Sequence, residues 1–146
     1  MTTTTREQIM AAVLATIPTP SGGAVKRFVG TPQAIPAGGL IILREGELQR
    51  TAEYLSPLQY EFSLSIDIEI YVQGADMPTQ LDSLLMATRA AFSDVRLGGL
   101  SDWLEASPPE IDFDQSMVLD TTASTKPHLA ARLPLVVIFT TTSDLG

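Results

Sequence analysis

The sequence contains no cysteine and only one histidine, His128. Without thiols the chain forms neither a disulfide framework nor a thiolate metal site, and it has no cysteine nucleophile. Asp120 and Ser124 lie in the same loop as the histidine. A catalytic base must be held beside its nucleophile, and nothing in this spacing fixes that geometry. The sequence therefore presents no convincing active site.

Basic residues are also scarce. The 9 lysines and arginines stand against 17 aspartates and glutamates, which gives a net charge of −8. Affinity for nucleic acid comes mainly from lysine and arginine side chains that displace counterions from phosphates. Because no part of the sequence carries a basic cluster, we do not expect this chain to bind DNA or RNA tightly.

Long hydrophobic runs are missing as well. The longest extends from Leu133 to Phe139, which is the length of a strand, and it contains Pro134. A membrane-spanning helix needs about 18 or more apolar residues in succession. The N-terminus lacks the basic region and the apolar segment of a secretory signal peptide. We expect a soluble protein that has no membrane partner.

The residues that are present suffice for one folded domain. Hydrophobic residues make up 45% of the 146 residues, and this length fits a single domain over residues 1–146. A first helix is predicted to begin at a capping box on Thr4 or Thr5. It is predicted to end before Pro18, because proline breaks a helix interior.

A second helix is predicted after Gly74. It opens at Asp76 or Thr79, has a proline near its first turn where proline is tolerated, and ends within residues 93–95. Its apolar side chains repeat at three- and four-residue spacing, which predicts one buried stripe. The stripe consists of Leu81, Leu84, Leu85, Thr88 and Phe92.

The remaining segments predict strands. Strands that follow one another in the sequence favour hairpins. Two helices that pack on one face of a sheet give a fold of two layers. We therefore predict an α+β fold, a two-layer sandwich of a mostly antiparallel or mixed β-sheet with two α-helices packed on one face. Trp103 is predicted to anchor the core. The predicted strands are 24–30, 40–45, a return strand 47–55 after a turn at Glu45-Gly46, the long segment 58–73, and two or three more within 101–107, 108–120 and 128–141.

The segment 58–73 alternates apolar and polar side chains without a break. A strand of this length spans about 53 Å at ~3.3 Å per residue, whereas a domain of this size has a radius of gyration near ~15 Å. One possibility is that it runs past its own domain, where an unpaired edge would suit a neighbouring subunit. The other is that it bends at 56–58 or carries a bulge near Ser63–Ser65.

Pairs of carboxylates lie two residues apart on predicted strands, so each pair shares one face. The pairs are Asp67 with Glu69 and Asp112 with Asp114. Such oxygen ligands suit a divalent cation, but no histidine or asparagine lies beside either pair. We therefore favour a solvated acidic face, to which Glu61 also belongs, and predict no metal site.

The order of these features resembles the tail terminator (tail completion) proteins of tailed phages. The resemblance spans roughly residues 6–142 and is best over Leu81–Leu100, and its motifs form a pattern rather than a chemical signature. They are a helix ending in "TIPTP", then "AIPAGGLIIL", a long strand ending in "IEIYVQG", the helix and turn "MPTQLDSLLMATRAAFSDVRLGGL", and a final strand "LPLVVIFTTTSDL".

The resemblance implies an α+β structural virion protein without enzymatic activity or cofactor. Proteins of this family form a ring, usually of six copies, on the head-proximal end of the tail tube, after assembly in the host cytoplasm. The ring ends tail polymerisation and forms the surface that joins the tail to the head. The implied partners are further copies of the chain, the tail tube protein, the head–tail connector or neck protein, and DNA that passes without specific binding.

A ring places one face of each subunit toward a channel. Our hypothesis is that Glu61, Asp67 and Glu69 face this channel and repel the passing DNA. A ring of six would multiply the charge of −8, which opposes association unless apolar contacts or divalent ions offset it.

Other classes of protein stay open at this point. One is a head–tail adaptor or neck protein, although such proteins are usually richer in helix. Another is a small enzyme with a hot-dog fold, for which Asp82 would be the candidate carboxylate. A third is a ligand-binding protein or a tube component of a secretion system of phage-like ancestry.

Overall fold

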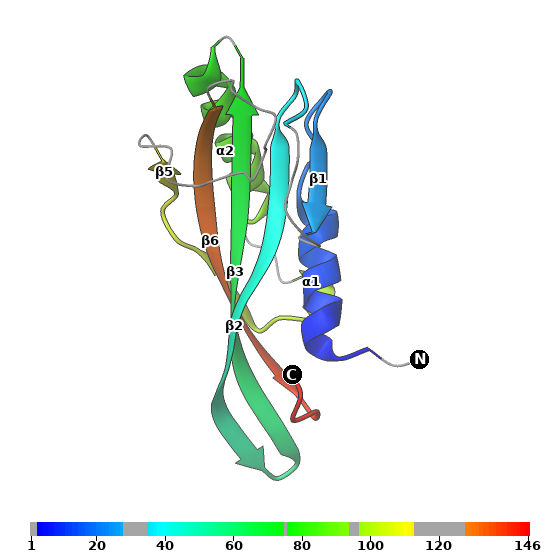
Figure 1. Cartoon of the computed structure of the whole chain (residues 1–146). Helices are drawn as coiled ribbons and strands as arrows, with labels where there is room; N and C mark the ends of the chain where they lie inside the picture. Colours follow the sequence, from blue (N-terminus) through cyan, green and yellow to red (C-terminus); the bar gives the residue numbers. More distant parts are fainter. Residues whose placement is uncertain (1–2, 28–34, 75, 94–96, 113–127) are drawn as a thin grey trace.

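The architecture is α+β, with two helices beside a six-stranded mixed sheet (Figure 1). The computed structural model describes residues 3–27, 35–74, 76–93, 97–112 and 128–146. The elements are α1 (Thr5–Thr16), β1 (Ala24–Arg27), β2 (Leu40–Leu55), β3 (Leu58–Gln73), α2 (Met77–Ala91), the 3-10 turn η1 (Leu97–Gly99), β4 (Trp103–Ala106), β5 (Glu110–Asp112) and β6 (His128–Thr141).

The strands follow the order β1-β2-β3-β6-β4, and β5 also pairs with β6. The pair β1–β2 is parallel, and all the other pairs are antiparallel. Strand β3 is therefore central, with β2 on one side and β6 on the other. The predicted fold class, a two-layer α+β sandwich with a mixed sheet, is confirmed.

Both helices pack on the same side of the sheet. Thr4 caps α1, since its hydroxyl accepts a hydrogen bond from the Glu7 N–H at 3.2 Å, and the helix ends at Thr16, before Pro18 as predicted. Helix α2 begins after Asp76 and has Pro78 in its first turn, as predicted. Neither described helix is long and apolar enough to cross a membrane.

One hydrophobic core joins the helices to the sheet. The apolar stripe of α1 and the stripe of α2 meet alternate residues of β3 and β6, and we call this side of the sheet the helix-side face. The predicted α2 stripe is confirmed, although Leu84 is only partly buried. The core residues of β3 are Phe62, Leu64, Ile66, Ile68, Ile70 and Val72.

Strand β2 differs from its prediction. The turn expected at Glu45-Gly46 is wrong, because β2 continues through it as a single strand. The pairing with β3 shifts by one residue between Glu45 and Leu48, so an extra residue bulges from β2. A Cβ atom on Gly46 would lie 2.7 Å from the backbone oxygen of Ser65. Glycine is needed here because it lets the bulge approach β3 closely.

Strand β3 has the predicted bounds, and of the two alternatives left open for it, an unpaired edge along the strand does not apply over Tyr60–Gln73. It pairs with β2 along one edge and with β6 over Tyr60–Gln73 along the other. The register shifts lie in β2, not at the predicted positions in β3. Among the described residues, β1 covers the outer edge of β2 only over Leu40–Leu43. Beyond Leu43, no described strand pairs with this edge of β2.

Trp103 does not anchor the core as predicted, because its side chain is 57% exposed. It begins β4, where Leu104 and Ala106 pack against the core. Alternation then turns Trp103 to the opposite side of the sheet, the outer face, where Ile138 of β6 is its direct partner.

Some predictions fall on residues that the structure does not describe. Asp114, Asp120 and Ser124 lie outside the described residues, so the predicted Asp112–Asp114 pair and the predicted loop around the histidine are not placed. The predicted strand 24–30 is described only as far as Arg27.

Candidate functional site

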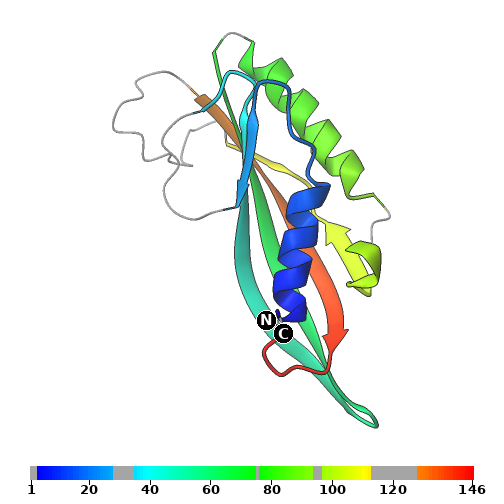
Figure 2. The same ribbon diagram turned by 90° about the vertical axis from the view of Figure 1, so that its right-hand side faces the viewer.

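The far end of the β2–β3 hairpin projects beyond both helices. We call residues 49–62 the hairpin arm; Ser56 and Pro57 connect its two strands. In both ribbon views the arm extends past the lower end of α1, and α2 lies still further from its tip (Figures 1 and 2). The described helices therefore leave the arm uncovered.

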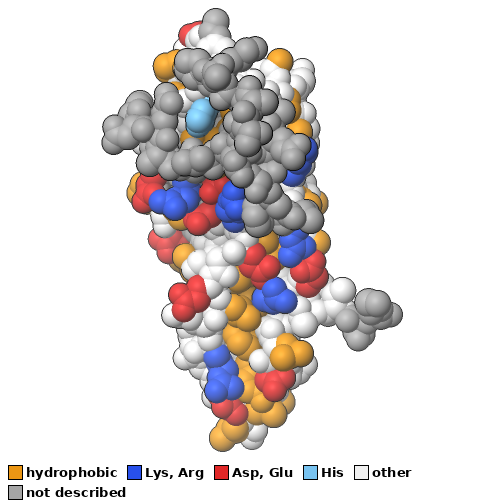
Figure 3. Space-filling model, viewed as in Figure 1, with side chains coloured by type: hydrophobic (Ala, Val, Ile, Leu, Met, Phe, Trp, Pro, Cys, Tyr) orange, Lys and Arg blue, Asp and Glu red, His pale blue; other side chains and the backbone are white. Residues whose placement is uncertain are grey.

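The helix-side face of the arm continues the apolar surface of the core. Leu58 and Tyr60 share this face with buried Phe62, and Leu55 is the direct partner of Leu58. Leu55 is 78% exposed and Leu58 is 47% exposed. Figure 3 shows hydrophobic side chains running as a stripe down this end of the molecule. The arm thus presents to solvent a surface that elsewhere in the sheet is covered by helices.

Aromatic rings connect the core to the arm. The ring of Phe62 stacks on Phe139 of β6 with centroids 5.6 Å apart, and it lies 6.5 Å from the ring of Tyr60. The guanidinium of Arg50 lies 5.6 Å from the Tyr60 ring centroid, within the range of a cation–π contact. These contacts hold the base of the arm on the core.

The outer face of the sheet carries a band of charged side chains nearer its middle (Figure 3). Arg44 Nε lies 2.5 Å from Glu69 Oε1, and the Tyr71 hydroxyl donates to the same oxygen at 3.0 Å. Burial raises the pKa of this tyrosine. Arg132 pairs with Glu110 at 2.5 Å. We call these residues, together with Asp67, the charged band.

Asp67 lies inside the charged band. Its partners across the strands are Arg44 and Pro134. Burial raises the pKa of its carboxyl above the ordinary value, and the carboxylates of Glu69 and Glu110 act in the same direction. The arginines of the band oppose this shift without overcoming it.

The three predicted acidic residues share the outer face, but they do not form one acidic surface. Glu69 is ion-paired, and its side chain is only 13% exposed. Glu61 belongs to the arm, where it accepts hydrogen bonds from Thr51 Oγ1 at 2.8 Å and from the Tyr54 hydroxyl at 3.4 Å. Their orientation toward a channel stays a prediction.

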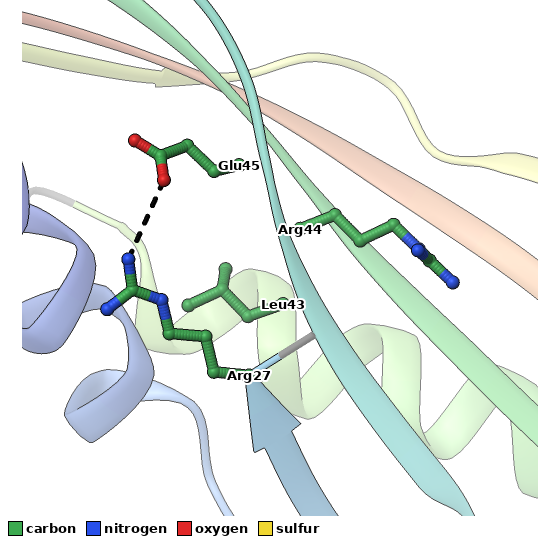
Figure 4. A pocket seen from close by; sticks show the side chains of 4 residues that line it. All are labelled: Arg27, Leu43, Arg44 and Glu45. Atoms are coloured by element: carbon green, nitrogen blue, oxygen red, sulfur yellow. Dashed lines mark ion pairs between the residues drawn. The ribbon is translucent and has the colours of Figure 1, made fainter. Parts of the chain in front are cut away.

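A second charge network lies on the helix side of β2. Arg27 forms ion pairs with Glu7 of α1 and Glu45 of β2, and Arg6 pairs with the same Glu45. The hydrogen bond from Arg27 holds the pKa of Glu7 below its ordinary value. Figure 4 shows Arg27 and Glu45 in a shallow hollow on one side of β2, whereas Arg44 points to the other side. This network attaches α1 to the sheet.

The structure describes two of the residues named for enzymatic alternatives, His128 and Asp82. His128 begins β6, with its ring 6.5 Å from that of Tyr71. Asp82 lies exposed on α2. Among the described residues, no group of three potential metal ligands gathers.

Comparison of the sequence with protein-family models gives no match, and comparison with curated proteins gives none either.

Proposed function

We propose that this chain is a structural virion protein of the tail terminator kind. Copies of it, six in the ring that the resemblance implies, cap the head-proximal end of the tail tube and end its polymerisation. The ring then offers the surface to which the connector or neck protein binds. The sequence pattern over residues 6–142 and the α+β sandwich both support this proposal.

The hairpin arm is the observation that carries the proposal. A monomer would leave Leu55 and Leu58 in water together with the outer edge of β2. Exposed apolar surface of this kind, next to unpaired strand edges, marks a protein–protein contact. In an assembly, the apolar surface of the arm would be buried against a neighbouring protein.

The charge of the chain supports passage of DNA without tight binding. The net charge is −8, and Arg44 and Arg132 of the charged band are already paired with carboxylates. Phosphates are held by lysines and arginines that are available to them. A channel formed by such subunits would therefore not retain a genome during its passage.

Deletion of the gene from the phage that encodes the chain tests this function. Electron microscopy of the resulting particles should show overlong tubes without heads, because nothing stops tube growth. Tails of normal length beside filled, unjoined heads would instead indicate an adaptor. Unchanged infectious particles would contradict both roles.

Complementation sharpens the same experiment. The wild-type gene should restore tail length, whereas a gene with Leu55→Asp and Leu58→Asp should not, because the arm would no longer be apolar. Met86→Asp is the matched control, since Met86 is an exposed apolar residue of α2 that lies away from the arm. It should restore tails as the wild-type gene does.

A further inference from the structure

The chain carries a second uncovered apolar surface besides the arm. Trp103, on the outermost strand β4, lies beside Ile138 on the outer face. Exposed tryptophans are frequent anchors of protein interfaces. In the strand order, β4 stands on the opposite side of the sheet from β2, whose edge is exposed in the arm. One chain thus has two different apolar patches, on different strands.

The charges around these patches are complementary. Arg50 lies on the same face of the arm as the apolar stripe, because it pairs with Phe62. The surface near Trp103 carries the carboxylates of Asp102 and Glu105, both exposed. In a chain of net charge −8, an arginine facing these acids offsets part of the repulsion between two copies.

The size of the arm favours a contact with the body of another copy. Each side of a standard interface uses roughly 20–30 residues, which is more than residues 49–62 supply. Two arms packed only on each other would make a small interface. An arm that lies across a second sheet also brings the surrounding sheet and helix surfaces into contact.

We infer that the hairpin arm of one copy packs with Leu55 and Leu58 over Trp103 of the next copy. The contact joins two different patches. The arm of each copy therefore binds one neighbour, and the Trp103 patch of the same copy binds the arm of another. Repetition of such a head-to-tail contact produces a closed ring when the rotation between copies closes. The ring rests on the proposed function, whereas the contact rests on the two surfaces themselves.

Cross-linking tests the contact directly, because the chain has no cysteine of its own. The full chain carries Ser56→Cys together with Asp102→Cys, both at exposed positions beside the contact residues, and circular dichroism checks that the fold is retained. A short bis-maleimide is added to the purified protein and to lysates in which tails assemble. Denaturing gels then report covalent products in multiples of 15.7 kDa.

The expected result is a ladder of products that extends to the ring. Each single-cysteine variant alone should give no ladder, and neither should Ser56→Cys combined with Met86→Cys, the matched control. Adding Arg50→Glu to the double-cysteine variant should weaken the ladder at least several-fold. Adding Glu105→Arg as well should restore it, since the opposite charges then face each other again.

Four results would overturn the inference. A strong dimer from Ser56→Cys alone would show that arm packs on arm. A double-cysteine product that stops at the dimer would show a two-fold contact instead of a ring. An equally strong ladder with Met86→Cys would show collision without specificity, and no product in either sample would show that the surfaces do not meet.

Gene deletion and cross-linking together distinguish a failure of the contact from a failure of the proposed function. Overlong tails after gene deletion without a cross-linked ladder would leave the function standing and remove this contact. A specific ladder with normal tails after gene deletion would leave the contact standing and remove the function.

Discussion

At the scale of single residues, two carboxylates of β3 have different surroundings although they lie two residues apart on one face. Glu69 receives Arg44 and the hydroxyl of Tyr71. Asp67 lies between Arg44 and Pro134 of the neighbouring strands, and its pKa is raised mainly by burial. The ionised form of Asp67 is therefore less favourable in the folded chain than in the unfolded chain.

This difference predicts the effect of Asp67→Asn. A raised pKa in the folded state means that ionisation of Asp67 reduces stability as the pH rises from its ordinary value of 3.8 upward. The variant should match the wild type near pH 3. At pH 7 its free energy of unfolding should exceed that of the wild type by a few tenths of a kcal/mol, the size usual at partly exposed positions. The variant should therefore unfold at a higher urea concentration.

Urea unfolding of both proteins at a series of pH values gives the measurement. The difference between the curves isolates Asp67 from the other titrating groups. A variant that is less stable than the wild type at pH 7 would mean that Arg44 and Arg132 stabilise the carboxylate more than burial penalises it.

The sequence predicts which face these residues occupy, but not what they contact. Strict alternation over residues 58–73 places Glu61, Asp67 and Glu69 together, and β3 bears this out. Their partners come from other strands: Arg44 is 25 positions before Glu69 in the chain. Pairing at that separation depends on strand order and register, which no local pattern encodes.

At the scale of elements, the β2–β3 hairpin depends on bulges that let β2 remain one strand. A one-residue slip would otherwise turn its side chains to the wrong face. The bulge after Glu45 restores the match between the core residues Leu43 and Leu48 and their partners in β3. Gly46 is part of this bulge, and its missing side chain makes room for Ser65.

Gly46→Ala should therefore destabilise the fold. The added Cβ would lie 2.7 Å from the Ser65 backbone oxygen, so the strands must separate. We expect a loss of about 1–3 kcal/mol, as for other overpacked sites, measured by chemical unfolding. Glu47→Ala in the same bulge is the control, because its side chain is exposed, and it should change stability by no more than about 0.5 kcal/mol. Equal stability of the Gly46→Ala variant and the wild type would contradict this view of the bulge.

The elements differ in how far the sequence predicts them. Strand β3 and both helices follow from alternation, capping and helical spacing, because each signal is local and strong. The sequence divides β2 in two because Glu45-Gly46 has the composition of a turn. It also predicts Trp103 in the core, because nothing in a short edge strand shows which alternate residues face inward.

At the scale of the whole molecule, the β2–β3 hairpin extends past its own helices (Figures 1 and 2), and in the proposed ring it reaches a neighbouring copy. The net charge of −8 on each copy opposes such an assembly. In the proposed ring, the apolar arm, the exposed tryptophan and the charges beside them together outweigh that repulsion. Because the proposed contact joins two different patches, it repeats around a ring instead of stopping at a pair.

The most direct test of the central claim is a cryo-EM reconstruction of the head–tail junction in intact particles of the encoding phage. The account predicts a ring of six copies of this chain between the tail tube and the connector, with each arm lying against the next subunit. Particles that lack this chain, or that hold it at another place or as separate single copies, would contradict the account.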